Sequence, residues 1–112
     1  GGAGVHVEYL AHELSRLMDV EVRCFGDQHQ QAEHLQILGF KESKLSLPNT
    51  NTALSSIFST LNTCIQMNTG TIDADIVHCH TWYAQFAGVL AKLCYGTPLV
   101  VTTHSLEPLR PW

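Results

Sequence analysis

The chain has 112 residues, of which 6 are Lys or Arg and 10 are Asp or Glu, so its formal charge is −4. A chain of this length builds one domain around one core more readily than two. The acidic balance argues against a nucleic-acid-binding protein, which needs clustered basic residues to meet phosphate. No apolar run approaches the roughly 18 residues of a membrane span. The start also lacks the charged and then apolar stretches of a signal peptide.

The four cysteines are Cys24, Cys64, Cys79 and Cys94, and none forms a C-x-x-C pair. This spacing favours four reduced thiols that pack as small hydrophobes, and a cytoplasmic protein, over a disulfide framework. The chain opens on Gly1-Gly2 without a methionine and closes on Arg110-Pro111-Trp112. We therefore expect a fragment of a longer protein.

The first quarter of the chain predicts a helix followed by a strand. Apolar residues recur at steps of three and four between residues 5 and 18, directly after the opening glycines, which is typical of an amphipathic helix. Residues 20–25 alternate and end at Gly26-Asp27, which predicts a strand and a turn. The polar stretch 28–49 predicts a loop with a short helical turn at about residues 32–38.

The remainder predicts two helices and two strands. N-cap candidates at residues 49–52 precede an expected helix at about 53–67. A strand at 75–80, a helix at 82–95 ended by Gly96, and a strand at 98–103 follow. The expected inward positions of the two helices are Leu54, Ile57, Phe58, Leu61 and Ile65, and then Phe86, Ala87, Val89, Leu90 and Leu93.

This order of elements predicts an α/β fold with an open, Rossmann-like parallel sheet and right-handed connections. The last two strands are continuous apolar runs, so we expect helices on both faces of the sheet. In such a fold the glycine loop normally follows a central first strand. We predict that this first strand is missing here and that the piece alone is poorly stable.

Histidines follow both of the last two strands. His78 and His80 alternate along their strand and should share one face, with Cys79 on the other. His104 follows the next strand, and ligands of open α/β sheets bind outside the carboxyl ends of strands. We therefore expect His80, His104 and the Gly1-Gly2-Ala3-Gly4 stretch to share one site. The alternatives are structural histidines with buried partners and a tight turn without a ligand.

The glycines at the start of a helix would let backbone amides approach an anion such as a diphosphate. Trp82 and Tyr83 open the next helix and either stack on a sugar or belong to the core, which is the preferred interpretation for Tyr83. Glu107 and Arg110 lie beyond His104 and either contact a polar substrate or form a solvated loop.

Other chemistries receive less support. The His-x-His pair could bind a metal with His104 as third ligand, as in a metal-dependent hydrolase, but the ligand count is short and no metal is expected. The sequence has no G-x-S-x-G elbow and no Walker lysine, which disfavours acyl transfer and P-loop chemistry.

Three blocks of the sequence, residues 1–7, 75–83 and 101–112, resemble the amino-terminal domain of retaining glycosyltransferases. The resemblance implies the GT-B fold, in which two Rossmann-like domains face each other across a cleft. Within that group the chain is similar to the glycogen-synthase-like branch that includes maltose-1-phosphate synthase. The resemblance is loose from about residue 28 to residue 73, and it makes residues 1–112 a partial amino-terminal, acceptor-side domain.

The resemblance also implies roles for single residues. His80 matches the catalytic histidine that contacts the donor sugar near the point of transfer. The glycines match the loop that approaches the donor diphosphate, namely Gly1, Gly2 and Gly4. The residues implied on the acceptor or substrate side are His104, Ser105, Glu107 and Trp82. A lysine in the glycine loop of the other glycogen-synthase branch has no counterpart here.

The implied reaction transfers glucose, with retention, from ADP-glucose or another nucleotide glucose to an α-glucan or a glucose phosphate in glycogen synthesis. The resemblance implies no cofactor, and it implies partners that are a nucleotide-sugar donor, a glucan or sugar-phosphate acceptor, and a missing carboxy-terminal domain. Neither nucleic acid nor membrane is expected. Because the missing domain holds most of the nucleotide, the fragment should be inactive alone. A non-catalytic glucan-binding module and the metal-dependent hydrolase remain alternatives.

Overall fold

The computed structural model describes residues 2–45, 48 and 51–105. The chain divides into two compact units, Gly1–Thr63 and Cys64–Trp112. Both units combine helices with β-strands, so the predicted α/β class is confirmed. None of the described helices is long and apolar enough to cross a membrane.

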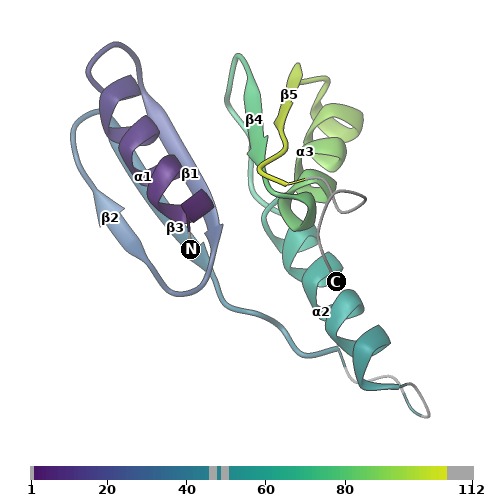
Figure 1. The fold of residues 1–112 in the computed structure, drawn as a ribbon. Coiled ribbons are helices and arrows are strands. Elements are labelled where there is room, and N and C mark those ends of the chain that lie inside the picture. Colours follow the sequence, from purple (N-terminus) through teal and green to yellow (C-terminus); the bar gives the residue numbers. More distant parts are fainter. Residues whose placement is uncertain (1, 46–47, 49–50, 106–112) are drawn as a thin grey trace. The chain divides into compact units, whose positions relative to one another are not determined.

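The first unit contains a helix on a small mixed sheet. The helix α1 (Gly2–Leu14) packs against β1 (Val20–Phe25), as Figure 1 shows. Strand β1 pairs in parallel with β3 (Leu35–Phe40), and the short β2 (His29–Gln31) pairs with β3 in the antiparallel direction. The bounds of β1 are those predicted, whereas α1 begins three residues earlier than expected and ends before Leu17 and Met18, which are exposed.

The prediction of a loop with a helical turn at residues 32–38 is wrong, because β3 begins within this segment. Strand β3 pairs with β1 from Val20–Leu35 to Phe25–Phe40. The backbone hydrogen bonds of β3 are therefore made to a strand that is distant in sequence. The chain also folds back closely over Gly39. A side chain there would begin 2.6 Å from the Gln28 nitrogen, and the Gly39 N–H donates to the Gln28 carbonyl oxygen at 2.7 Å. Only glycine admits so close a backbone.

The helix α2 (Thr52–Gln66) contains the residue at which the two units divide. The side chain of Asn51 accepts the N–H of Leu54 at 2.9 Å, which confirms an N-cap in the predicted segment. The apolar stripe predicted for α2 is not buried. Leu54, Ile57 and Ile65 are each more than two-fifths exposed.

The second unit contains a helix on a two-stranded parallel sheet. The helix α3 (Trp82–Tyr95) covers one face of β4 (Val77–His80) and β5 (Leu99–Thr102), which run in register from Val77–Leu99 to His80–Thr102 (Figure 1). As predicted, Gly96 ends α3. Its backbone is left-handed, and its N–H donates to the Lys92 carbonyl at 3.0 Å.

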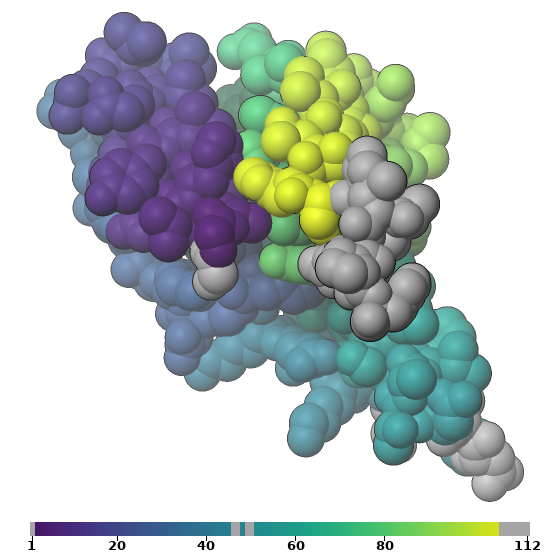
Figure 2. Space-filling model, viewed as in Figure 1, coloured from purple at the N-terminus to yellow at the C-terminus, as the bar shows by residue number. Residues whose placement is uncertain are grey.

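The described strands form two sheets, and β2 pairs with β3 in the antiparallel direction, so the predicted truncated, open parallel sheet is not confirmed. In the second unit, a described helix covers only one face of the sheet, whereas helices on both faces were predicted. Val100, in register with His78 on the face opposite α3, is 42% exposed, and β5 lies on the visible surface in Figure 2. Val101, in register with Cys79, is 45% exposed, so α3 covers its own side of β5 only in part. Val89 and Leu93 of α3, expected inward, are exposed as well. No described strand joins the sheets, and a missing first strand remains a prediction.

Candidate functional site

The face of β4 opposite α3 carries two histidines. Cys79 points toward α3 and is buried, while His78 is exposed and His80 is partly exposed. The imidazole rings of His78 and His80 are 4.1 Å apart between centroids. The prediction that these two side chains share one face, with Cys79 on the other, is therefore confirmed.

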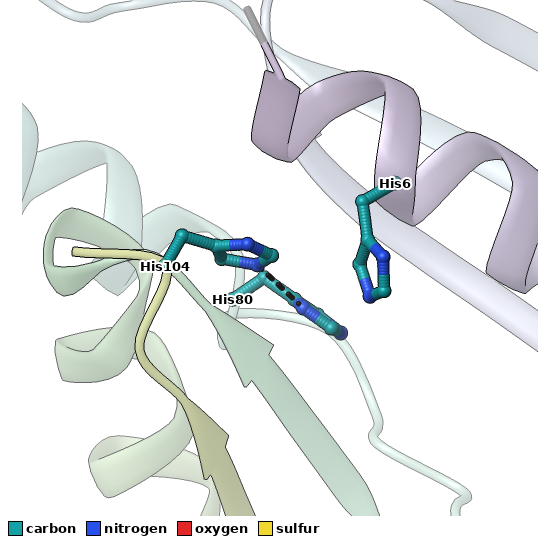
Figure 3. A group of neighbouring side chains, drawn as sticks. All are labelled: His6, His80 and His104. Atoms are coloured by element: carbon teal, nitrogen blue, oxygen red, sulfur yellow. Dashed lines mark hydrogen bonds between the residues drawn. The ribbon is translucent and has the colours of Figure 1, made fainter.

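A hydrogen bond joins the two histidines that follow the strands. His80 is the last residue of β4, and His104 lies two residues beyond β5. Their Nδ1 and Nε2 atoms are 3.1 Å apart, and their ring centroids are 5.3 Å apart (Figure 3). One nitrogen must donate and the other accept, so each ring fixes the tautomer of the other. The predicted meeting of His80 and His104 at the carboxyl ends of parallel strands is present within the second unit.

A second polar pair lies beside the first. The Nε2 atom of His78 is 2.7 Å from the hydroxyl oxygen of Thr102. Thr102 is also the register partner of His80, so it lies on the same edge of the sheet. Thr102 is not among the predicted site residues. The signal that would identify it is the strand register, which a single sequence does not give.

Between His80 and Trp82 the backbone adopts an unusual conformation. Thr81 has φ 71° and ψ 148°, and it is the only described residue other than glycine with a positive φ. A β-branched residue rarely adopts this region, which glycine enters freely. Nothing in the local sequence indicates this conformation.

Two aromatic side chains begin α3. Trp82 is 66% exposed, so its indole does not belong to the core, and its substrate role stays a prediction. Tyr83 packs edge-on against Trp82 with centroids 5.8 Å apart. Because Tyr83 is itself 40% exposed, the interpretation of this residue as core is wrong.

The opening glycines are helical. Gly2 and Gly4 lie in the first turn of α1, instead of in a loop before it, and a side chain at either position would meet no described atom within 4 Å. They belong to the first unit and the histidine pair to the second, so their predicted convergence remains a prediction. Ser105 is exposed next to His104. The remaining predicted residues, Gly1, Glu107 and Arg110, lie outside the described residues.

The comparison with known proteins covers the whole chain. Residues 1–112 match the family described as Glycosyltransferase Family 4. The chain belongs to that family. Over 112 residues it is 44% identical to an alpha-maltose-1-phosphate synthase of Mycolicibacterium smegmatis and 43% identical to alpha-maltose-1-phosphate synthases of two Mycobacterium tuberculosis strains. In each case the alignment takes in 100% of this chain and 26% of the relative. The resemblance to an amino-terminal GT-B glycosyltransferase domain is thus confirmed.

The thiols of this Family 4 chain offer no nucleophile at the site. All four cysteines are free, as predicted, and burial raises the pKa of the Cys64 and Cys79 thiols. A thiol with a raised pKa remains protonated at neutral pH and reacts slowly. Cys94 is exposed, so it does not pack as the interior thiol that the sequence predicted.

The same glycosyltransferase unit offers an incomplete metal site. His80 and His104 supply two imidazoles, whereas zinc takes three or four protein ligands. Among the described residues of this unit, no third His, Cys, Asp or Glu side chain has a ligand atom grouped with those of His80 and His104. The metal-dependent hydrolase stays an alternative prediction.

Proposed function

We propose that residues 1–112 are the acceptor-side part of the amino-terminal domain of a retaining hexosyltransferase. In this proposal the enzyme moves glucose from a nucleotide glucose, ADP-glucose first among them, to an α-glucan or a glucose phosphate in cytoplasmic glycogen synthesis. Membership of Glycosyltransferase Family 4 and the synthase relatives support the reaction class. The single observation that carries the site assignment is the bonded pair His80–His104 at the ends of two parallel strands.

The chemistry requires little from the protein beyond placement and charge stabilisation. The bond between the anomeric carbon of glucose and the diphosphate oxygen breaks, and the acceptor oxygen forms its bond to that carbon on the same face. The acceptor proton passes to the departing phosphate oxygen, so no protein nucleophile is needed. Retaining glycosidases instead place two carboxyl groups about 5 Å apart. The groups described at this edge are imidazoles and a hydroxyl, which suits the phosphate-assisted route.

The hydrogen bond between the imidazoles suggests how His80 acts. If His104 donates from Nε2, His80 accepts at Nδ1 and carries its own proton on Nε2. That N–H is then oriented to donate to an oxygen of the donor sugar without bringing a full charge. A donor fixed in this way costs no reorganisation when charge develops during transfer. The exposed indole of Trp82, two residues further on, offers an apolar face to the sugar ring.

The test is a His80→Ala change in the complete protein. Removing one preorganised donor from a reacting centre typically lowers kcat about 10²–10³-fold. We expect a loss of that size in glucose transfer from ADP-glucose to a maltooligosaccharide or to glucose 1-phosphate. The melting temperature should stay close to that of the parent, because His80 is partly exposed and packs outside the α3 interface.

The matched control is His12→Ala, which removes an exposed imidazole from α1. It should leave both activity and melting temperature unchanged. Full activity in His80→Ala would refute the site assignment. If the complete parent protein bound α-glucan but transferred no glucose from any nucleotide glucose, the chain would belong to a glucan-binding module instead.

A further inference from the structure

The backbone at Thr81 is strained between two well-anchored elements. The other described residues with positive φ are Gly26 and Gly96, both of which tolerate it. A threonine at φ 71° and ψ 148° lies at the border of a region that only glycine adopts routinely. Such a conformation persists only where the surrounding structure imposes it.

The anchors lie immediately on either side of Thr81. On the strand side, Cys79 is buried against α3 and His80 is in register with Thr102 and bonded to His104. On the helix side, the Cys64 thiol donates to the Tyr83 carbonyl oxygen at 3.1 Å. The direction of the chain must therefore change from strand to helix within a single residue. The threonine hydroxyl contributes no capping hydrogen bond to α3.

We propose that Thr81 is a positioning residue whose left-handed backbone holds the His80 imidazole against His104 and the Trp82 indole at the surface. A negative φ would rotate the end of β4 relative to the start of α3, so that the two anchors could not both be kept. The backbone conformation is what matters, since the hydroxyl caps nothing. This inference rests on the proposed function, because it assigns Thr81 an effect that acts through His80.

Three substitutions in the complete protein separate the backbone from the side chain. Thr81→Val keeps the β-branched shape and removes the hydroxyl, so kcat should change by less than about 3-fold. Thr81→Gly makes the positive φ unstrained, so kcat should be retained and the melting temperature should rise by about 2–4 °C. Thr81→Pro fixes φ near −65° and cannot adopt the observed conformation. It should lower kcat by at least about 10-fold, as small misplacements of reacting groups do.

A double-mutant cycle with His80→Ala identifies the route of the effect. If Thr81 acts through His80, the Thr81→Pro change lowers kcat in the parent but by less than about 3-fold in the His80→Ala background. A purely structural role would lower kcat by the same factor in both backgrounds. If the proline variant does not fold, the glycine variant still decides, because the strain relieved at φ 71° should outweigh the greater freedom that glycine gives the unfolded chain. A melting temperature lower for Thr81→Gly than for the parent would overturn the inference.

These outcomes are distinguishable from failure of the proposed function. Unchanged kcat in His80→Ala refutes the role of His80 and, with it, any positioning through that residue. A large loss in His80→Ala, combined with equal effects of Thr81→Pro in both backgrounds, refutes the role of Thr81 alone.

Discussion

The helices α1 and α3 both contain glycine, and the two sets of glycines differ in what surrounds them. In α3, Gly88 is buried, and a side chain there would run into the Cys79 thiol and would begin 2.6 Å from a Leu99 methyl group. In α1, a side chain at Gly2 or Gly4 would enter space that no described atom occupies within 4 Å. Packing within the chain therefore explains why residue 88 is a glycine, but it does not explain the glycines at positions 2 and 4.

Glycine can therefore occur in these two helices for two different physical reasons. Glycine in a helix costs roughly 0.5–1 kcal/mol relative to alanine. At Gly88 the close approach of α3 to β4 and β5 offsets that cost. Gly2 and Gly4 lie in the first turn of α1, where the described residues offer no such compensation, and the approach of a donor diphosphate to this turn stays a prediction.

The largest loss of stability in this comparison should follow the Gly88→Ala substitution. The added methyl group overpacks the interface between α3 and its sheet, which typically costs about 1–3 kcal/mol despite the better helix propensity of alanine. The denaturant midpoint of the complete protein should fall accordingly.

The Gly88→Ala effect has an internal control. Cys79→Ala removes the thiol that the new methyl group would meet, so the double variant should regain part of the loss. Two independent, additive losses would show that Cys79 does not account for the glycine at position 88.

A smaller effect of opposite sign on stability should follow Gly4→Ala. The substitution should stabilise the protein by up to about 1 kcal/mol, because alanine is the better helix former and nothing nearby obstructs it. If the donor diphosphate approaches this turn, the KM for the nucleotide glucose should rise at least about 10-fold, which corresponds to 1.4 kcal/mol. Steady-state kinetics with the donor varied would measure this rise.

The matched control for Gly4→Ala is Gly70→Ala. A side chain at Gly70 would also meet no described atom within 4 Å, but Gly70 is not one of the predicted site residues. Its KM for the donor should be unchanged. If the Gly4→Ala variant is more stable but keeps the parental KM for the donor, the opening glycines begin a helix and do not bind the donor diphosphate.

Much of the second unit could be predicted from the sequence. The bounds of α3, its end at Gly96 and the two flanking strands follow from local signals, namely a helical period, a left-handed glycine and short apolar runs. The pairing of His80 with His104 followed from a general rule, because parallel strands with a helical crossover bring their carboxyl ends to one edge.

The remainder depends on contacts between residues distant in sequence. Strand β3 forms because Leu35–Phe40 meets β1, and its apolar residues alone do not distinguish a strand from a helical turn. The hydrogen bond between His78 and Thr102 depends on register, and the positive φ of Thr81 has no local sequence signal. The exposed apolar side chains of α2 and β5 likewise show that periodicity predicts a face and not what covers it.

The most direct measurement is an experimental structure of the complete protein with a bound nucleotide glucose. The account predicts that the His80 imidazole lies within hydrogen-bonding distance, about 3 Å, of an oxygen of the donor hexose and keeps its contact with His104. A hexose bound beyond hydrogen-bonding reach of His80, with the His80–His104 pair facing solvent, would contradict it.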